Sequence, residues 1–198
     1  MSVPAGVPPF HAVVLAGGRS SRLGGRPKAR LRREGRTLVE LTVEAAREAA
    51  GVVVVGPADL DVPGGVLRAR EDPPFSGPAA GVAAGLRALD ALPDVPWTMT
   101  LACDMPGVCR AVPLLLDAAR GGPDDAAGYV CVPPDGRRQP LATLYRSDVL
   151  RAAYAGQDPA DRSVSSFVRD LPLRGVAVPD EATADVDTWD DVRRFRLG

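Results

Sequence analysis

The sequence predicts an α/β fold: one domain over residues 1–198, built as a three-layer α/β/α sandwich around a mostly parallel sheet. Short runs of apolar and β-branched residues alternate with stretches of helical periodicity, as they do in parallel α/β sheets. The chain has 198 residues and is 45% hydrophobic, which is enough for one substantial core but would leave two domains small. We find no repeat, low-complexity segment or interdomain linker.

Seven short runs are predicted to be strands, because each is apolar or β-branched and is bounded by glycine, proline or polar residues. Runs that are apolar throughout are typical of strands covered on both faces. In chain order the predicted strands are 12–16, 52–56, 66–70, 97–103, 128–132, 141–145 and 175–178.

Six stretches are predicted to be helices. The first begins with Thr37 and Glu40 in the spacing of a capping box and is expected to stop at Gly51. The second starts near Pro78, since proline is favoured in a first turn, and ends near Leu92; its alanines keep it thin enough to lie close to a sheet. The others are predicted at 112–120, 147–154, 163–171 and 188–196.

The loop after the first strand, within "LAGGRSSRLGGRPKARL", contains Lys28, the only lysine among 24 lysine and arginine residues. Gly17 and Gly18 let the backbone approach a ligand and offer N–H groups, while Arg22 and Lys28 add positive charge. The range Arg19–Arg36 holds eight basic residues and one acid in a chain of net charge -1, which favours a local anionic ligand. An ammonium is a compact point charge and differs from a guanidinium in a tight phosphate site. The loop therefore predicts polyphosphate binding; an ordinary glycine turn is the alternative.

The segment "TLACDMPG" places Asp104 directly after an apolar strand. Ligands gather outside the carboxyl ends of parallel strands, and Mg²⁺ prefers oxygen ligands and often bridges substrate phosphates. We therefore expect Asp104 to bind magnesium, the alternative being that it caps the following helix. Asp185 and Asp187 precede the last predicted helix, where Thr188 begins a second capping pair; they would complete the metal site or cap that helix.

A third segment, "REDPPFSGPAAG", contains Asp72 and Gly77. The region of Gly77 would present N–H groups at a helix start, and Asp72 would accept hydrogen bonds from a base such as guanine. A loop shaped by its three prolines would explain the same residues without a ligand.

Taken together, these segments resemble the molybdenum cofactor guanylyltransferase family, the MobA-like nucleotidyltransferases. The similarity runs in order through "LAGGRSSRLGGRPKARL", "REDPPFSGPAAGVAAGL", "LACDMP", "RRQPLATLY" and "VDTWDDV". It implies a Rossmann-like fold of the nucleotide-diphospho-sugar transferase type. It also implies transfer of GMP from GTP, or of another nucleotide, to the terminal phosphate of molybdopterin, with release of pyrophosphate and a requirement for Mg²⁺.

The resemblance also implies roles for single residues. Lys28, Arg22 and Asp104 would be catalytic, and Asp104 with Asp187 would bind the metal. The nucleotide-binding residues would be Leu15, Ala16, Gly17, Gly18, Arg22, Lys28, Asp72, Gly77 and Asp104.

The segment "DGRRQPLATLY" offers residues for the second substrate. Arg137, Arg138 and Gln139 precede a predicted strand and suit the phosphate or pterin of an acceptor, or form a solvated hairpin tip. The acceptor phosphate has a second pKa of about 6 and is already charged at neutral pH, so no general base is needed. This agrees with a chain whose one histidine, His11, stands just before the first strand and is expected to be structural.

Departures from the family pattern leave the base and the acceptor open. Pro27 stands where an aspartate is frequent, Asp185 and Asp187 where the family often has an asparagine-containing segment, and the region of Gly56 where an asparagine is expected. A cytidylyltransferase acting on molybdopterin or on another phosphorylated metabolite is one alternative. A non-catalytic nucleotide-binding domain is the other.

Composition excludes several other classes. Three cysteines without CxxC spacing argue against disulfides and zinc and are expected to be reduced and buried. The start of the chain lacks a basic leader and no apolar run approaches the ~18 residues that cross a bilayer, so we expect a cytoplasmic protein. The arginine cluster has no interleaved aromatics, which argues against nucleic acid. Transient contact with molybdenum cofactor biosynthesis proteins is a further expectation.

Overall fold

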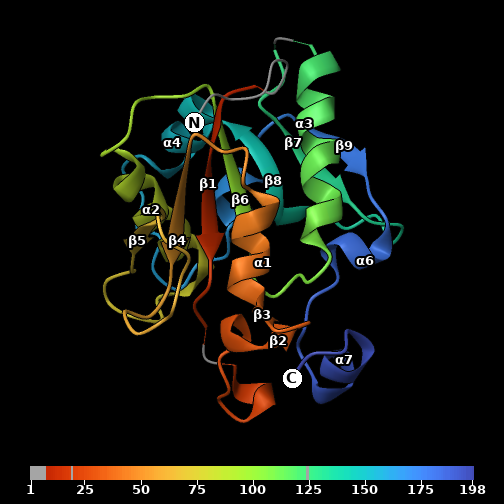
Figure 1. Ribbon diagram of the computed structural model, residues 1–198. Coiled ribbons are helices and arrows are strands. Elements are labelled where there is room, and N and C mark those ends of the chain that lie inside the picture. Colours follow the sequence, from red (N-terminus) through yellow and green to blue (C-terminus); the bar gives the residue numbers. More distant parts are fainter. Residues whose placement is uncertain (1–7, 19, 124) are drawn as a thin grey trace.

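The computed structural model describes residues 8–18, 20–123 and 125–198 (Figure 1). Arg19 of the predicted basic cluster, Asp124 and the start of the chain, residues 1–7, lie outside the described residues. Within the described ranges, no helix combines the length and the apolar character needed to cross a membrane.

One seven-stranded sheet forms the centre of the fold, in the order β5-β4-β1-β6-β8-β7-β9. Each of the seven predicted strands is present, with its ends within two residues of the prediction. Only β8 runs antiparallel to its neighbours, so the sheet is mostly parallel, as predicted. The strands are β1 Phe10–Leu15, β4 Gly51–Val55, β5 Leu67–Ala69, β6 Trp97–Ala102, β7 Gly128–Val132, β8 Gln139–Arg146 and β9 Leu173–Ala177.

Helices lie on both faces of this sheet (Figure 1). A small hairpin and three 3-10 helices supplement them: β2 Arg32–Arg33, β3 Arg36–Thr37, η1 Ser21–Leu23, η2 Lys28–Arg30 and η3 Val108–Arg110. The α-helices are α1 Leu38–Ala45, α2 Gly77–Leu89, α3 Ala111–Gly121, α4 Ser147–Tyr154, α5 Ser165–Val168, α6 Asp180–Thr183 and α7 Trp189–Arg194.

The sequence predictions of helix ends need two corrections. The first helix ends at Ala45 rather than at Gly51, because the N–H of Ala50 donates to the carbonyl of Phe10 at 2.8 Å and Gly51 already pairs in register with His11 as the first residue of β4. Strand pairing thus begins before the helix could continue. The predicted helix 163–171 is reduced to the single turn of α5. The hairpin β2–β3 and α6 were not predicted.

Two cores, one on each face of the sheet, follow the alternation of side chains along the strands. Phe10, Ala12 and Val14 of β1 are fully buried against the face covered by α1 and α3. Val13 of the same strand is fully buried on the opposite face, which α2, α4 and α5 cover. The three-layer α/β/α prediction is therefore confirmed.

Helix α2 lies very close to β1 because glycines face the strand. An ideal Cβ on Gly85 would stand 2.4 Å from Cγ1 of Val13, and one on Gly81 would stand 3.0 Å from Cδ2 of Leu15. The alanines were expected to keep this helix thin enough to lie close to the sheet. At the contact itself, Gly81 and Gly85 do this instead. This packing sets where the start of α2 lies relative to the end of β1.

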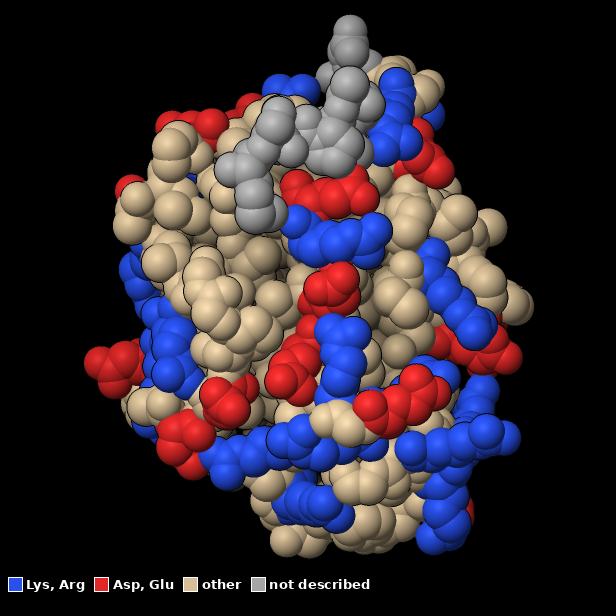
Figure 2. Space-filling view, viewed as in Figure 1, with Lys and Arg blue, Asp and Glu red and all other residues tan. Residues whose placement is uncertain are grey.

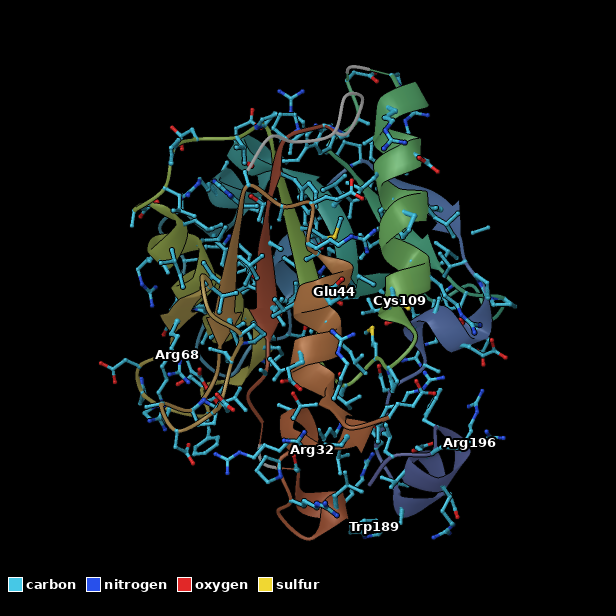
Figure 3. All side chains as sticks on the ribbon, in the orientation of Figure 1. Arg32, Glu44, Arg68, Cys109, Trp189 and Arg196 are labelled. Atoms are coloured by element: carbon cyan, nitrogen blue, oxygen red, sulfur yellow. The ribbon has the colours of Figure 1, made fainter. Side chains whose placement is uncertain are left out.

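The cysteine prediction holds only in part. Cys103 and Cys131 are buried free thiols, and burial raises the pKa of both. Cys109 is a free thiol as well, but it is exposed on η3, beside α1 (Figure 3), so the expectation that all three are buried is wrong. Cys109 is the middle residue of η3 and lies outside the strands and the buried cores, which explains the difference.

Gly85→Ala tests the close approach of α2 to the sheet. Alanine favours an isolated helix by about 1 kcal/mol over glycine, yet a methyl group forced against buried Val13 costs about 1–3 kcal/mol. We expect a net loss of about 1 kcal/mol in the free energy of unfolding, measured by urea denaturation. Gly121→Ala, at the open end of α3 with nothing within 4 Å, is the matched control and should not destabilise. A Gly85→Ala variant more stable than the parent would contradict the packing argument.

Candidate functional site

The loops after β1 and β6 leave the sheet side by side. The two strands are parallel neighbours, with Leu15 paired to Ala102, and the N–H of Cys103 donates to the carbonyl of Leu15 at 2.9 Å. Gly17 and Gly18 follow β1, and Asp104 follows β6, so the two segments singled out from the sequence meet at one sheet edge. In Figure 1 this is the lower end of the sheet, toward which the arrowhead of β1 points.

Lys28 lies between two carboxylates at this edge. Its Nζ is 2.9 Å from Oδ2 of Asp104 and 2.6 Å from Oδ1 of Asp187, and its side chain is only 19% exposed. Burial by itself lowers the pKa of Lys28, but the charge of Asp104 and the hydrogen bonds to Asp187 and Asp104 outweigh it and hold the pKa above its ordinary value. Lys28 is therefore a fixed positive charge that pairs with both Asp104 and Asp187. These two residues follow it in the chain by 76 and 159 positions.

A small core holds the lysine loop against the end of the chain. Leu23 and Leu31 flank the loop that carries Lys28 and are buried together with Val186 and Val192 beside α7. The N–H of Val186 also donates to the carbonyl of Asp104 at 2.9 Å. Val186, the residue before Asp187, thus fixes the position of this aspartate in two ways: by its apolar packing and by its backbone hydrogen bond.

Asp185 and Asp187 were expected either to complete the metal site or to cap the last helix, and the capping of α7 bears on this choice. Thr188 and Asp191 form the predicted capping box, with each side chain accepting from the other residue's backbone N–H. Asp187 is therefore not the N-cap of α7, and its carboxylate points to Lys28 and to Arg22, whose guanidinium is 3.3 Å from Oδ2. The side chain of Arg22 is 75% exposed, and this ion pair links it to the site.

Asp185 completes an acidic group around Lys28. Its residue surface is open to solvent, but protein atoms crowd the carboxyl group. This partial desolvation, followed by the charges of Asp104 and Asp187, raises the pKa of Asp185 to about 6. The arrangement concentrates negative charge that Lys28 balances only in part.

A cavity of about 620 Å³ opens at the same edge, over the ends of β4, β1 and β6. Seven of the predicted nucleotide-binding residues line it, and Arg22, Asp72, Asp187, Arg137, Arg138 and Gln139 do not. Those seven are Leu15, Ala16, Gly17, Gly18, Lys28, Gly77 and Asp104.

The sequence predictions missed the four charged or aromatic cavity-lining residues other than Lys28 and Asp104. Glu71 and Phe75 line the cavity beside the start of α2, and Arg30 and Asp59 form an ion pair across its rim. Asp72, predicted to meet a base, is exposed outside the cavity, and its role stays a prediction. The alternation of strand side chains beyond β5 was the available signal, because Leu67, Ala69 and Glu71 share one parity.

The start of α2 is only partly available to a ligand. Gly77 begins α2, close to the predicted start at Pro78; it has a φ of 89° and lines the cavity. The N–H of Ala79, however, already donates to the carbonyl of Arg162 at 3.3 Å. Fewer free N–H groups remain at this helix end than the sequence suggested.

The turn between β7 and β8 lies at the same sheet edge. Because β8 is antiparallel to β6, its first residues lie beside the end of β6. Arg137 and Arg138 are exposed on this turn, and Gln139 begins β8 half-buried. The charge of Arg137 acts to lower the pKa of Asp185, which places this arginine near the acidic group.

The donors suit a hard cation, although the set is small. Among the side chains that the structure describes, no three of the His, Cys, Asp and Glu type are grouped so as to hold a metal ion. Asp104 and Asp187 nevertheless converge on one point, where an ammonium now lies, and carboxylate oxygens are the ligands that Mg²⁺ prefers. Two protein carboxylates with substrate phosphates are a usual way to bind this ion.

Positive side chains gather around the same end of the molecule. Figure 2 shows lysine and arginine residues in a band across its lower part. Arg32 of β2 lies in this region, as do Trp189 and Arg196 of the C-terminal segment (Figure 3). The surface beside the cavity is therefore suited to approaching anions.

Comparison with known proteins agrees with this geometry. Residues 12–175 match the family model of the MobA-like NTP transferase domain. A probable molybdenum cofactor guanylyltransferase of Opitutus terrae is 37% identical over 184 residues, which span 89% of this chain and 88% of the relative.

Two solved structures are similar in fold. Rv0371c of Mycobacterium tuberculosis is 25% identical, with a TM-score of 0.73 and coverage of 96% of this chain and 97% of the other. Molybdopterin-guanine dinucleotide biosynthesis protein A of Archaeoglobus fulgidus is 18% identical, with a TM-score of 0.64 over 93% of this chain and 96% of that one, and supports the fold alone. The chain belongs to the MobA-like NTP transferase family and is a nucleotidyltransferase.

Proposed function

We propose that this protein transfers GMP from GTP to the terminal phosphate of molybdopterin, with release of pyrophosphate and with Mg²⁺ as the metal. The two substrates are supported by its similarity to relatives named as molybdenum cofactor guanylyltransferases. The observation that carries the proposal is Lys28, held between Asp104 and Asp187 at the end of a nucleotide-sized cavity.

The proposed reaction needs no group to remove a proton. An oxygen of the acceptor phosphate forms a bond to the α-phosphorus of GTP, while the bond from that phosphorus to the α–β bridging oxygen breaks. Pyrophosphate leaves with the electron pair of the broken bond. The acceptor phosphate, with a second pKa of about 6, is already an anion at neutral pH. The cavity accordingly lacks a histidine, since His11 is buried at the other end of β1 and bonds the carbonyl of Pro93 at 2.9 Å.

The main barrier is repulsion between two anions, and the chain opposes it with positive charge. Two unit charges 4 Å apart interact by about 4 kcal/mol at an effective dielectric of 20, so one well-placed cation matters. Lys28 would contact the phosphates from inside the cavity, Arg22 would approach them from the rim, and backbone N–H groups of Gly17 and Gly18 would hold them in place. Catalysis would then consist of positioning and electrostatics.

The metal in this proposal is held by Asp104 and Asp187. When bound, Mg²⁺ would add charge neutralisation at the phosphates. Lys28 occupies the space between these carboxylates, so the lysine would turn toward the phosphates as the carboxylates take up the ion.

The acceptor would enter from the side of the β7–β8 turn. Arg137 and Arg138 are exposed there beside the acidic group, and Gln139 is half-buried behind them, an arrangement suited to gripping a phosphate or a pterin. The proposal includes a cytoplasmic location, which three free cysteines support, and transient contact with other proteins of molybdenum cofactor synthesis.

The first test is a screen of the four nucleoside triphosphates against molybdopterin, with and without Mg²⁺, scored by pyrophosphate release. We expect release with GTP and Mg²⁺ and none after chelation of the metal, with recovery when Mg²⁺ is restored. A higher rate with CTP would replace GMP transfer by CMP transfer. Nucleotide binding without release under any condition would make the protein a binding domain.

Asp104→Ala tests the metal and phosphate site. Loss of a preorganised charged group at the reacting centre is worth about a hundredfold to a thousandfold, and here the metal would be lost as well, so turnover should fall below detection. The fold should persist, because the carboxylate lies outside the cores. Asp94→Ala, before the opposite end of β6 and exposed, is the matched control. Near-parental turnover of Asp104→Ala would rule out the metal assignment.

Lys28→Arg tests whether an ammonium is required. The gap between the two carboxylates places both oxygens within 2.9 Å of a single nitrogen, and a planar guanidinium does not fit the same point. We expect pyrophosphate release to fall at least about tenfold, and more in Lys28→Ala. Arg26→Lys, exposed in the same loop, should keep parental activity. Full activity of Lys28→Arg would mean that any cation serves at this position.

A further inference from the structure

We propose that Thr100, Thr143 and Tyr145 are positioning residues for the acceptor substrate: their buried hydroxyl groups hold a bulge of β8 in shape, at the border between the cavity and the β7–β8 turn. This inference rests on the proposed function, which brings the acceptor to that turn. The three side chains would act through the backbone of β8 and would not touch a substrate.

Strand β8 does not follow its neighbour β7 residue by residue. Val130 of β7 pairs with Thr143 of β8. The next residue of β7, Cys131, pairs with Gln139, so residues 140–142 are extra on the β8 side. On its other side β8 pairs regularly with β6, beside which it lies in Figure 1. Bulges of this kind re-aim side chains and are frequent beside active sites.

The backbone carbonyl groups at the start of this bulge are bound by side chains. The carbonyl of Pro140 accepts from the hydroxyl of Thr100 at 2.7 Å and from that of Tyr145 at 3.1 Å. The carbonyl of Gln139 accepts from the hydroxyl of Thr143 at 2.7 Å. All three donor side chains are fully buried. Buried polar groups are costly unless they are paired, so these hydrogen bonds fix the path of the bulge.

The packing of the core does not by itself require hydroxyl groups at these positions. Tyr145 belongs to the core under α2, α4 and α5. Thr143 faces the same side of the sheet because it lies two residues away, and Thr100 does so because it pairs with Thr143. Valine and phenylalanine have nearly the shapes of threonine and tyrosine but carry no polar atom. The hydroxyls therefore serve the carbonyls of the bulge.

The bulge lies at the border between the cavity and the acceptor side. Leu141, within the bulge, lines the cavity, and among the described lining residues it alone follows Asp104 in the chain. Arg137 and Arg138, which are exposed, come just before the bulge. The shape of the bulge therefore sets how the residues proposed to grip the acceptor lie relative to the nucleotide cavity.

The experiment measures pyrophosphate release by the full chain at varied concentrations of molybdopterin and, separately, of GTP. The double variant Thr100→Val/Tyr145→Phe loses both side-chain hydrogen bonds to the carbonyl of Pro140 and keeps the side-chain shapes. We expect the KM for molybdopterin to rise about tenfold, because the bulge relaxes when this buried carbonyl loses its partners. The KM for GTP and kcat should stay within about twofold of the parental values, as for a loss of acceptor binding alone.

A conservative variant and a matched control separate positioning from stability. Thr100→Ser keeps the hydroxyl and should keep the parental KM for molybdopterin, whereas Thr100→Val should raise it, though less than the double variant does. Thr98→Val is the control, because Thr98 is buried on the same strand and its hydroxyl bonds that of Ser147 at 2.8 Å instead of the bulge. Both of its KM values should be parental. A variant that only loses stability would lower kcat through its active fraction and leave both KM values unchanged.

Amide hydrogen exchange examines the bulge without any reaction. Exchange at residues 141–143 should become at least about threefold faster in the double variant and should not change in Thr98→Val. A parental KM for molybdopterin in the double variant, an equal rise in the KM for GTP, or unchanged exchange at the bulge would each overturn the proposal.

Failure of the proposed function has a different signature. In that case the parent protein itself releases no pyrophosphate with molybdopterin and any nucleoside triphosphate, and the role of the bulge in acceptor binding is overturned with it. Failure of the present proposal alone leaves the parent active and shows only in the variants.

Discussion

The contact of one ammonium with two carboxylates is the interaction on which the site depends. Lys28, Asp104 and Asp187 come from the first, middle and last parts of the chain, and each is placed by a different element. Charges brought together in this way are costly to bury unless they are paired. The ion pairs therefore allow three charged groups to stay concentrated beside the cavity, which the proposed function requires of them.

The scaffold supports this contact with apolar packing rather than with further charge. The parallel pairing of β1 and β6 brings the glycine turn beside Asp104. The core formed by Leu23, Leu31 and Val186 then ties the lysine loop to the segment of Asp187. On the other side of the cavity, the glycines of α2 let this helix approach β1 closely enough for its start to form a wall. Surface ion pairs alone would fix the site poorly, because each contributes little.

Much of this could be predicted from the sequence, because the signals are local. Strands and helices follow from periodicity and capping, and both capping boxes were found from residue spacing. Asp104 could be identified because it stands directly after an apolar strand, and Lys28 because it is the one lysine of the chain and lies in the glycine loop that follows β1. The end of α1 could not, since it is set by where β4 begins to pair with β1.

The direction in which individual side chains point was the second feature that could not be predicted from the sequence. The choice between Glu71 and Asp72 depends on which of two adjacent carboxylates faces the cavity, and this is decided by the pleat of β5 and by the bond from Phe75. The exposure of Cys109 likewise depends on the surface position of η3. Properties of this kind belong to the tertiary arrangement, so spacing along the chain carries little information about them.

The segment from Val186 onward is bound to the rest of the molecule through Asp104, through the small core and through Arg32, which exchanges two backbone hydrogen bonds with Gly198 at 2.8 and 2.9 Å. During synthesis this segment appears after the other parts of the site. The glycine turn, the lysine and the first acid are all made long before their final partner. A growing chain thus carries only one of the two carboxylates that pair with Lys28 until the segment of Asp187 has been made.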